Sequence, residues 1–409
     1  MHSLNTKKVS HEGTKEDTKA RRYSLCLGIF LCAFVRNVFL VTLILGLSLN
    51  AVAQKSISAQ VAKTAMTSLW HEYPAKWTYD HGLVLKGIER VWSMTDDKQY
   101  LDYIQRQMDH FVNDDGSIRT YSLDDYNIDN IAPGRNLLFL YKVTGQEKYR
   151  KAAATLREQL KTHPRTSEGG FWHKKIYPSQ MWLDGLFMGE PFYAEYAATF
   201  HDDSAFDDIA KQFILMERHA RDEKTGLLYH GWDESRKQRW SNPQTGRSPN
   251  FWGRAMGWYA MALVEVLDYF PRNHPQRAEL IAILNRTARA IAKYQDQRSG
   301  LWYQVMDKPG VKGNYLESSA ACMFVYALAK GSRNGYLPAS YRQVAQKGYR
   351  GIQKEFLKTD ANGQLNLEGT VSVAGLGGNP YRDGGAVIPM TAVRAGFTAA
   401  SNELRIRLA

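Results

Sequence analysis

The sequence predicts an all-α fold, an (α/α)6 barrel of six helical hairpins, for this chain of 409 residues. Two observations predict it. Apolar residues recur at helical spacing from residue 57 to residue 358, and a turn containing glycine returns after every second helix. β-branched residues in the alternation typical of strands are scarce. An open solenoid of helical hairpins is the structural alternative, and a repeat number of six favours the closed ring.

The helical pattern divides into separate amphipathic segments. In one of them Leu280, Ile283, Leu284 and Ile291 lie on a single face, which predicts that this face packs against another layer. A further helix at the C-terminus would complete six hairpins. The predicted helices span residues 57–72, 80–94, 97–113, 130–144, 147–162, 185–200, 204–220, 253–269, 276–295, 315–331 and 339–358.

A glycine turn followed by a short extended segment recurs along the chain. Its glycines are Gly116, Gly169, Gly226, Gly300 and Gly363, at spacings of 53, 57, 74 and 63 residues. In a ring of hairpins the loops after these segments gather at one end, where aromatic rings are suited to stack on sugar rings. For any single tryptophan the alternative is that it only packs a loop. The side chains expected at this mouth are Trp172, His173, Trp182, Tyr229, His230, Trp232, Trp252, Trp302 and Tyr303.

Residues 1–53 are predicted to be a signal peptide. An apolar run at 37–49 follows the basic residues Arg21, Arg22 and Arg36, and Ala51-Val52-Ala53 fits a cleavage site before Gln54. The run is short for a membrane anchor, which is the alternative. We therefore expect an exported protein, periplasmic or secreted, with one catalytic domain at 54–409 and no stable membrane association after removal of the signal.

Composition limits the class of partner. The chain has a net charge of +12, yet its basic residues are scattered and no nucleic-acid motif is present. An acidic carbohydrate is therefore expected as partner, with no nucleic acid, and the protein is expected to be a monomer. Cys322 is the one cysteine after the leader, so no intrachain disulfide is expected, and its helical setting predicts plain packing.

Two aspartates are candidate catalytic residues. Asp184 lies between Trp182 and Gly185 in an apolar segment, and Asp129 precedes it by 55 residues, about one repeat. Burial disfavours a charged carboxylate, so the pKa of Asp184 is expected to be raised, which would make it a proton donor. For each aspartate the alternative is a cap at the start of a helix.

Arg254 is a candidate for binding a carboxylate. It lies between Trp252 and Trp258, and a helix starting near Gly253 would place Arg254 and Trp258 on one face. The planar guanidinium suits a two-pronged contact with a carboxylate. The alternative is a cation–π or ion-pair contact between helices.

The segments 126–135, 180–188, 230–233 and 251–258 resemble the unsaturated rhamnogalacturonyl hydrolases, glycoside hydrolase family 105. These are close relatives of the unsaturated glucuronyl hydrolases of family 88. The likeness in order and spacing runs from Trp77 to Asp383, and its most specific motifs are Trp-x-Asp-Gly and Trp-x-Arg-x-x-x-Trp. The family's chemistry implies no metal and no other cofactor.

The resemblance implies removal of a terminal 4,5-unsaturated uronic acid, unsaturated galacturonyl from rhamnose, in the degradation of pectin-type polysaccharides. It implies that Asp184 protonates C4 of the enol ether and then deprotonates the water that adds at C5. Asp129 would hold ring hydroxyls, and repulsion between the two carboxylates would raise the pKa of one of them. The resemblance implies that the uronate subsite is lined by His230, Trp252, Arg254 and Trp258. Tyr79, Lys174 and Trp182 are the other candidate substrate-binding residues.

Other functions stay open at this point. They are an unsaturated glucuronyl hydrolase acting on glycosaminoglycan or ulvan oligosaccharides, a noncatalytic glycan-binding toroid, and a lyase or epimerase on the same fold. The segment 379–385 begins like the family's C-terminal motif, but residues 386–390 depart from it. This departure leaves open the twelfth helix, the closure of the ring and whether Arg382 reaches the mouth.

Overall fold

The computed structural model describes residues 57–372 and 374–385, which from Ser58 onward belong to one compact unit. The predicted signal peptide and the predicted twelfth helix lie outside the described residues. A helical stretch at 57–69 ends in a π-helical turn, Ala65–Leu69. The α-helices that follow are α2 (Tyr79–Thr95), α3 (Lys98–Asp109), α4 (Gly134–Thr144), α5 (Glu147–Thr162), α6 (Leu183–Phe200), α7 (Ala205–Ala220), α8 (Gly253–Tyr269), α9 (Arg277–Lys293), α10 (Ser318–Arg333) and α11 (Tyr341–Glu355).

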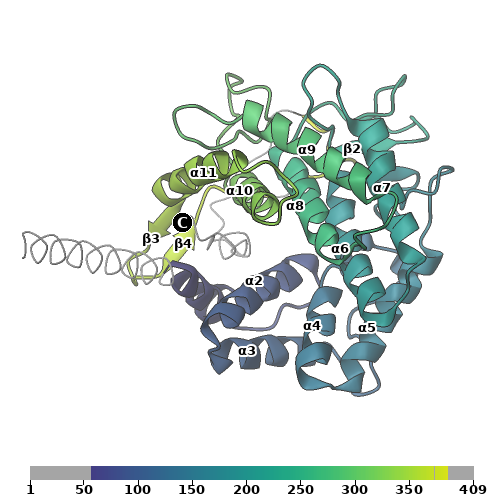
Figure 1. The fold of residues 1–409 in the computed structure, drawn as a ribbon, viewed down its shortest axis with the longest axis vertical. Coiled ribbons are helices and arrows are strands. Elements are labelled where there is room, and N and C mark those ends of the chain that lie inside the picture. The colour runs from purple at the N-terminus through teal and green to yellow at the C-terminus, as the bar shows by residue number, and fades with distance from the viewer. Residues whose placement is uncertain (1–56, 373, 386–409) are drawn as a thin grey trace, which may run out of the picture. The chain divides into compact units, whose positions relative to one another are not determined.

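These helices pack in pairs, α2 with α3 and so on to α10 with α11. The first helix of each pair also contacts the first helix of the next, so that α2, α4, α6, α8 and α10 form an inner layer and their partners an outer one (Figure 1). The prediction of an (α/α)6 barrel is confirmed. No helix within the described ranges is both long and apolar enough to cross a membrane.

The glycine turns close each repeat. All five predicted glycines have a positive φ, between 76° and 94°, a conformation that side chains with a Cβ rarely adopt. Around most of them the chain pairs back on itself, as Arg165 does with Phe171. Regular strands are short: β1 (Gln180–Trp182) pairs antiparallel with β2 (Gly231–Asp233), and β3 (Leu357–Thr359) pairs with β4 (Leu365–Leu367).

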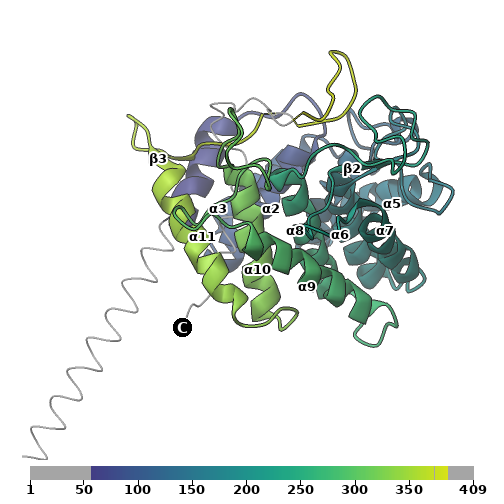
Figure 2. The same cartoon turned by 90° about the horizontal axis from the view of Figure 1, so that it is seen from above.

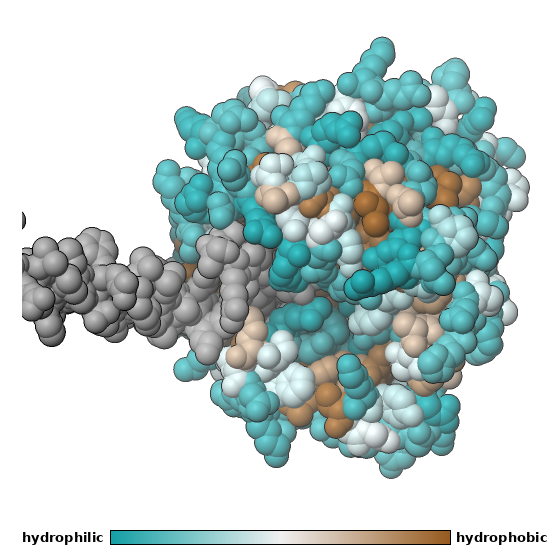
Figure 3. Space-filling model, viewed as in Figure 1, coloured by the Kyte–Doolittle hydropathy of each residue, from teal (hydrophilic) through white to brown (hydrophobic). Residues whose placement is uncertain are grey.

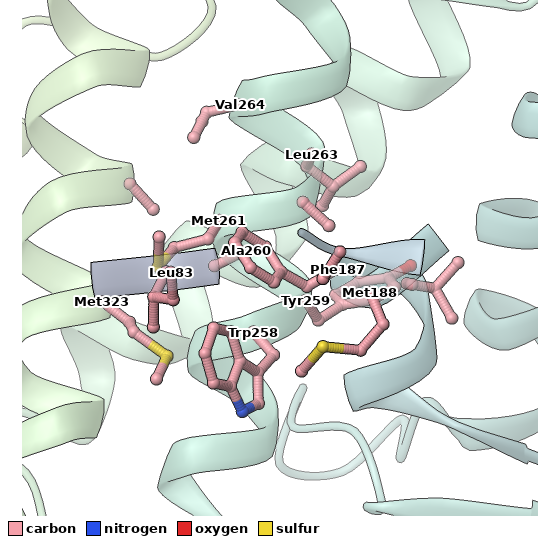
Figure 4. Packing of buried hydrophobic residues seen from close by; sticks show 14 of the residues in the cluster. Leu83, Phe187, Met188, Trp258, Tyr259, Ala260, Met261, Leu263, Val264 and Met323 are labelled. Carbon is pink, nitrogen blue, oxygen red and sulfur yellow. The ribbon is translucent and has the colours of Figure 1, made fainter. Parts of the chain in front are cut away.

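Large aromatic residues fill the core between the inner helices. Trp258 of α8 packs against Phe187 of α6, at 4.7 Å between ring centroids, and lies beside Met323 of α10 (Figure 4). Trp302, expected at the mouth, is fully buried and donates to the carbonyl oxygen of Ile291 at 2.7 Å. The expectation for Trp302 is wrong, because its ring and its polar atom are both satisfied by the helix layers.

Cys322 of α10 is buried in the same core, as its helical setting predicts. Burial raises the pKa of its thiol, which therefore stays protonated at neutral pH. A protonated thiol is a poor nucleophile, so the packing interpretation of Cys322 is confirmed.

A buried carboxylate joins the inner helices deeper in the barrel. Glu265 of α8 accepts hydrogen bonds from Arg135 of α4 at 2.5 Å and from Tyr326 and Lys330 of α10, and Arg135 also pairs with Glu195 of α6 at 3.1 Å. Burial raises the pKa of Glu265, but the positive charges of Lys330 and Arg135 lower it more. The pKa of Glu265 is therefore held well below its usual range. A cavity of about 40 Å³ adjoins this cluster. The face seen along the same direction as Figure 1 is hollowed, with hydrophilic residues in and above the hollow and hydrophobic ones among those below it (Figure 3).

Glu265→Gln is expected to lower the free energy of unfolding by about 3–5 kcal/mol, because it leaves Arg135 and Lys330 buried without their shared anion. Urea unfolding followed by circular dichroism measures the change. The matched control is Glu147→Gln on α5, whose pair with Arg150 is exposed and should change the unfolding free energy by less than about 0.5 kcal/mol. Equal effects of the two substitutions would contradict the structural role of Glu265.

Candidate active site

The starts of the inner helices carry the candidate residues. Tyr79 is the first residue of α2, Asp184 the second of α6 and Arg254 the second of α8, while Asp129 lies in the 3-10 helix Ile128–Ile131 ahead of α4. Burial raises the pKa of the Tyr79 hydroxyl, Asp129 and Asp184 raise it further, and Arg254 lowers it. These influences require all three charged groups to lie near one tyrosine. The structure therefore brings them together in one site.

Asp129 is an ion-paired carboxylate. Its Oδ2 lies 2.6 Å from Nζ of Lys174, and its Oδ1 lies 3.5 Å from Nε2 of His173. The backbone fixes this arrangement, because Ile128 N–H donates to the carbonyl oxygen of His173 and Lys174 pairs with Asn127. The cap of the 3-10 helix is Asn127, whose side chain accepts from Asp129 N–H at 3.1 Å. Asp129 thus faces Lys174 rather than capping a helix.

Asp184 faces His230. Its Oδ2 lies 3.1 Å from Nδ1 of His230, without the alignment of a hydrogen bond, and Leu183 N–H donates to the carbonyl oxygen of His230. Burial raises the pKa of Asp184, but His230 and His173 lower it more, so the pKa lies below its ordinary value. The expected raised pKa of Asp184 is wrong, because His230 and His173 lie beside the carboxylate, which the sequence did not show. The expected mutual repulsion of the two aspartates is likewise offset, because each faces a cationic or imidazole group.

His173 is the site residue that sequence reasoning did not assign a role. Its ring stacks on Trp182 at 4.4 Å between centroids. The negative charges of both aspartates favour the protonated ring and so act to raise its pKa. Burial lowers its pKa to about 4, so the ring is neutral at neutral pH. A Cβ on Gly185 would lie 3.2 Å from its Nδ1, so the glycine after Asp184 leaves room for this ring. The sequence signal was its position after the Gly169 turn, which put it among the side chains expected at the mouth.

The tryptophans of the site pack on its polar residues. Trp182 also stacks on Tyr177 at 4.9 Å, and Trp252 stacks on His230 at 4.5 Å. Trp252 and Trp258 are 2% and 1% exposed, which leaves no open ring face for a sugar in this conformation. Their contacts brace His230 and the inner helices. The packing alternative describes Trp258 best, while Nε1 of Trp252 has no hydrogen-bond partner among the described residues.

Arg254 is held by the chain itself. Its Nε donates to Oγ of Ser319 at 2.9 Å, and its Nη atoms donate to the carbonyl oxygens of Val371 and Ser372. Glu317, fully buried at the start of α10, lies 3.9 Å from Nη2. The contact between helices, given above as the alternative for Arg254, is present in the structure. No group of three or more histidine, cysteine or acidic side chains that could hold a metal occurs within the described ranges.

The helical barrel, the two carboxylates near its mouth and the known relatives together identify the protein as a glycosidase. The chain belongs to the family described as Glycosyl Hydrolase Family 88, whose model matches residues 51–397. A solved glycoside hydrolase from family 105 of C. acetobutylicum is 48% identical, with 85% of this chain and 98% of that chain covered and a TM-score of 0.82. The resemblance seen in the sequence is thereby confirmed.

Two further proteins are similar to the chain. The unsaturated rhamnogalacturonyl hydrolase YesR of Bacillus subtilis is 30% identical over 258 residues, which cover 62% of this chain and 70% of that protein. The unsaturated glucuronyl hydrolase of Bacillus sp. GL1 is 14% identical with a TM-score of 0.66, covering 86% of this chain and 95% of that one. The second likeness shows the fold alone.

We expect the imidazole of His173 to stay neutral across the range in which an ordinary histidine titrates, because its pKa is lowered to about 4. Nitrogen NMR of the labelled protein, with the signal assigned through His173→Gln, measures this directly. A titration midpoint of about 6.5 would mean that the ring is exposed to solvent, which would contradict the structure.

Proposed function

We propose that the protein removes a terminal 4,5-unsaturated uronic acid from an oligosaccharide by hydrating the C4=C5 enol ether, with Asp184 as the acid and base. The observation that carries the proposal is the pairing of Asp184 with His230 beside a second carboxylate, Asp129, that is already neutralised by Lys174. One acid is thereby left to exchange protons with the substrate, while the other is fixed as an acceptor for ring hydroxyls.

The lowered pKa of Asp184 fits this chemistry once the substrate is considered. In the free enzyme Asp184 is a carboxylate near neutral pH. A uronate brings a second negative charge into the buried site, and a like charge nearby raises the pKa of a carboxyl group. Substrate binding therefore favours uptake of the proton that Asp184 must deliver, with His230 close enough to share it.

Asp184 gives its proton to C4 of the substrate. The π electrons of the C4=C5 bond form the new C4–H bond, which leaves a cationic centre at C5 that the ring oxygen stabilises. Water adds its oxygen to C5 and returns a proton to Asp184. The resulting hemiketal opens to a ketone, and the hemiacetal left at C1 releases the aglycone as an alcohol. Asp184 ends the cycle protonated, as it began the chemical step.

We propose unsaturated galacturonyl-rhamnose, from pectin-type polysaccharides, as the substrate class. The sequence resemblance and the 30% identity to YesR support it. The principal alternative is an unsaturated glucuronyl substrate, since a protein named unsaturated 3S-rhamnoglycuronyl hydrolase is 25% identical over 285 residues. Export from the cytoplasm belongs to the same proposal and rests on the apolar run and Ala51-Val52-Ala53.

Incubation of the mature protein with an unsaturated galacturonyl-rhamnose disaccharide is expected to remove the ultraviolet absorbance of the conjugated enol carboxylate and to release rhamnose together. Absorbance and chromatography of the sugar products measure the two. Loss of absorbance only with an unsaturated chondroitin disaccharide would move the substrate to the alternative. A folded protein that leaves both substrates unchanged would overturn the proposed function.

Asp184→Asn is expected to lower kcat by a factor of about 10²–10⁴, because the amide cannot deliver a proton to C4. The matched control is Asp203→Asn, an exposed aspartate ahead of α7, which should leave kcat unchanged. Unfolding temperatures of both variants establish that the fold is retained. Turnover by Asp184→Asn at the unsubstituted rate would rule out its role.

A further inference from the structure

The segment after β4, residues 369–372 and 374–385, is here called the strap. It starts on the inner helices that carry the site. Ser318 N–H donates to the carbonyl oxygen of Gly369 at 3.1 Å, and Val371 N–H donates to Oε1 of Glu317 at 2.9 Å. Arg254 holds the next two carbonyl groups. The strap therefore begins beside the uronate subsite.

The strap then crosses to the segments that precede α6 and α8. Leu376 is fully buried, and a Cβ on Gly231 would lie 2.8 Å from its Cδ1 and 3.2 Å from Cδ1 of Trp182. Further on, Asn250 Nδ2 donates to the carbonyl oxygen of Gly384 at 2.7 Å. Figure 2 shows β2 and the yellow end of the described chain along the same upper edge of the barrel. The strap is thus one wall of the mouth that holds Asp184.

Arg382 is fixed on this wall by glycines. The strap turns back on itself between Gly377 and Arg382, and Nε of Arg382 donates to the carbonyl oxygen of Gly377 at 3.2 Å. The guanidinium lies close to the backbone of the strap, since a Cβ on Gly375 would lie 2.9 Å from its Cζ and one on Gly378 would lie 3.1 Å from its Nη2. Any other residue at these positions would displace it. The chain therefore orients the arginine before any ligand arrives.

No acidic side chain of the described ranges forms an ion pair with Arg382 within 4.0 Å. The adjacent carboxylate, Asp383, instead accepts from Gly385 N–H at 2.8 Å. Positive charge accumulates nearby, because the guanidinium of exposed Arg239 lies 4.3 Å from the ring of Tyr381, and Lys308 donates to Asn250. The three cations named here, Arg382, Arg239 and Lys308, therefore outnumber the one carboxylate beside them, Asp383.

We propose that Arg382 binds the carboxylate of an acidic sugar on the aglycone side of the cleaved bond, so that the enzyme prefers acidic oligosaccharides longer than a disaccharide. A planar guanidinium with its Nη edge free of acidic partners matches a carboxylate in a two-pronged contact. The strap that carries Arg382 contacts the segments preceding α6 and α8, and we place the proposed contact on the aglycone side of the uronate subsite. This inference rests on the proposed function and adds a specificity-determining residue to it.

The test compares an unsaturated galacturonyl-rhamnose disaccharide with the tetrasaccharide that carries one further galacturonate. The unsubstituted protein should show the higher kcat/KM on the tetrasaccharide. Arg382→Gln should lose about tenfold in kcat/KM on the tetrasaccharide, mainly through KM, because a charge-assisted contact is lost. On the disaccharide it should stay within about twofold of the unsubstituted protein. Arg382→Lys keeps the positive charge but loses the planar two-pronged geometry. Its kcat/KM on the tetrasaccharide should therefore lie between those of the unsubstituted protein and Arg382→Gln.

Two controls separate this effect from general ones. Arg289→Gln removes the same charge from the exposed face of α9 and should leave the preference intact. Reduction of the internal carboxylate of the tetrasaccharide to an alcohol should abolish the preference of the unsubstituted protein, a result that depends on no variant folding. An equal loss on both substrates, or no preference for the acidic tetrasaccharide, would overturn the inference. Activity on the disaccharide would still support the proposed function in that case.

Discussion

The geometry of the site depends on the ion pairs that the buried carboxylate of Glu265 makes with neighbouring helices. The carboxylate joins α8 to α4 through Arg135 and to α10 through Lys330, and Arg135 in turn reaches Glu195 of α6. Four inner helices are thereby fixed relative to one another by groups that cannot separate without leaving an unpaired buried charge. Because these helices or the turns ahead of them carry the site residues, the same contacts set the positions of the acids.

Charge balance is the second constraint on the mouth. Asp129 faces the ammonium group of Lys174, and Asp184 faces the imidazole of His230, so each acid has a basic group beside it. In the proposed mechanism an anionic substrate adds negative charge beside these groups, and the proton that Asp184 takes up offsets it. The acidity of Asp184 in that proposal is a property of the complex rather than of the free protein. The neutral ring of His173, between both carboxylates and Trp182, adds no charge of its own near neutral pH.

Much of this architecture could be predicted from the sequence because helical spacing and glycine turns are local signals. The predicted segment 253–269 matches α8 residue for residue, and the glycines of the predicted turns have positive φ. The structure places Tyr79, Asp129, Asp184 and Arg254 near one another. The direction of the pKa shift of Asp184 could not be predicted, because it depends on side chains that come together only in the folded ring. Burial of Trp302 and the engagement of Arg254 by Val371 escaped prediction for the same reason.

The buried ring of His173 also links the fold to acidity. An unfolded chain binds a proton on this histidine near its ordinary pKa of about 6.5, whereas the folded chain does so only at about 4. Between these values the unfolded state takes up more protons, so the free energy of unfolding falls as the pH falls, by about 3 kcal/mol for this one group at the lower limit. The packing that keeps His173 neutral beside the acids therefore makes the folded barrel less stable as the pH falls below about 6.5.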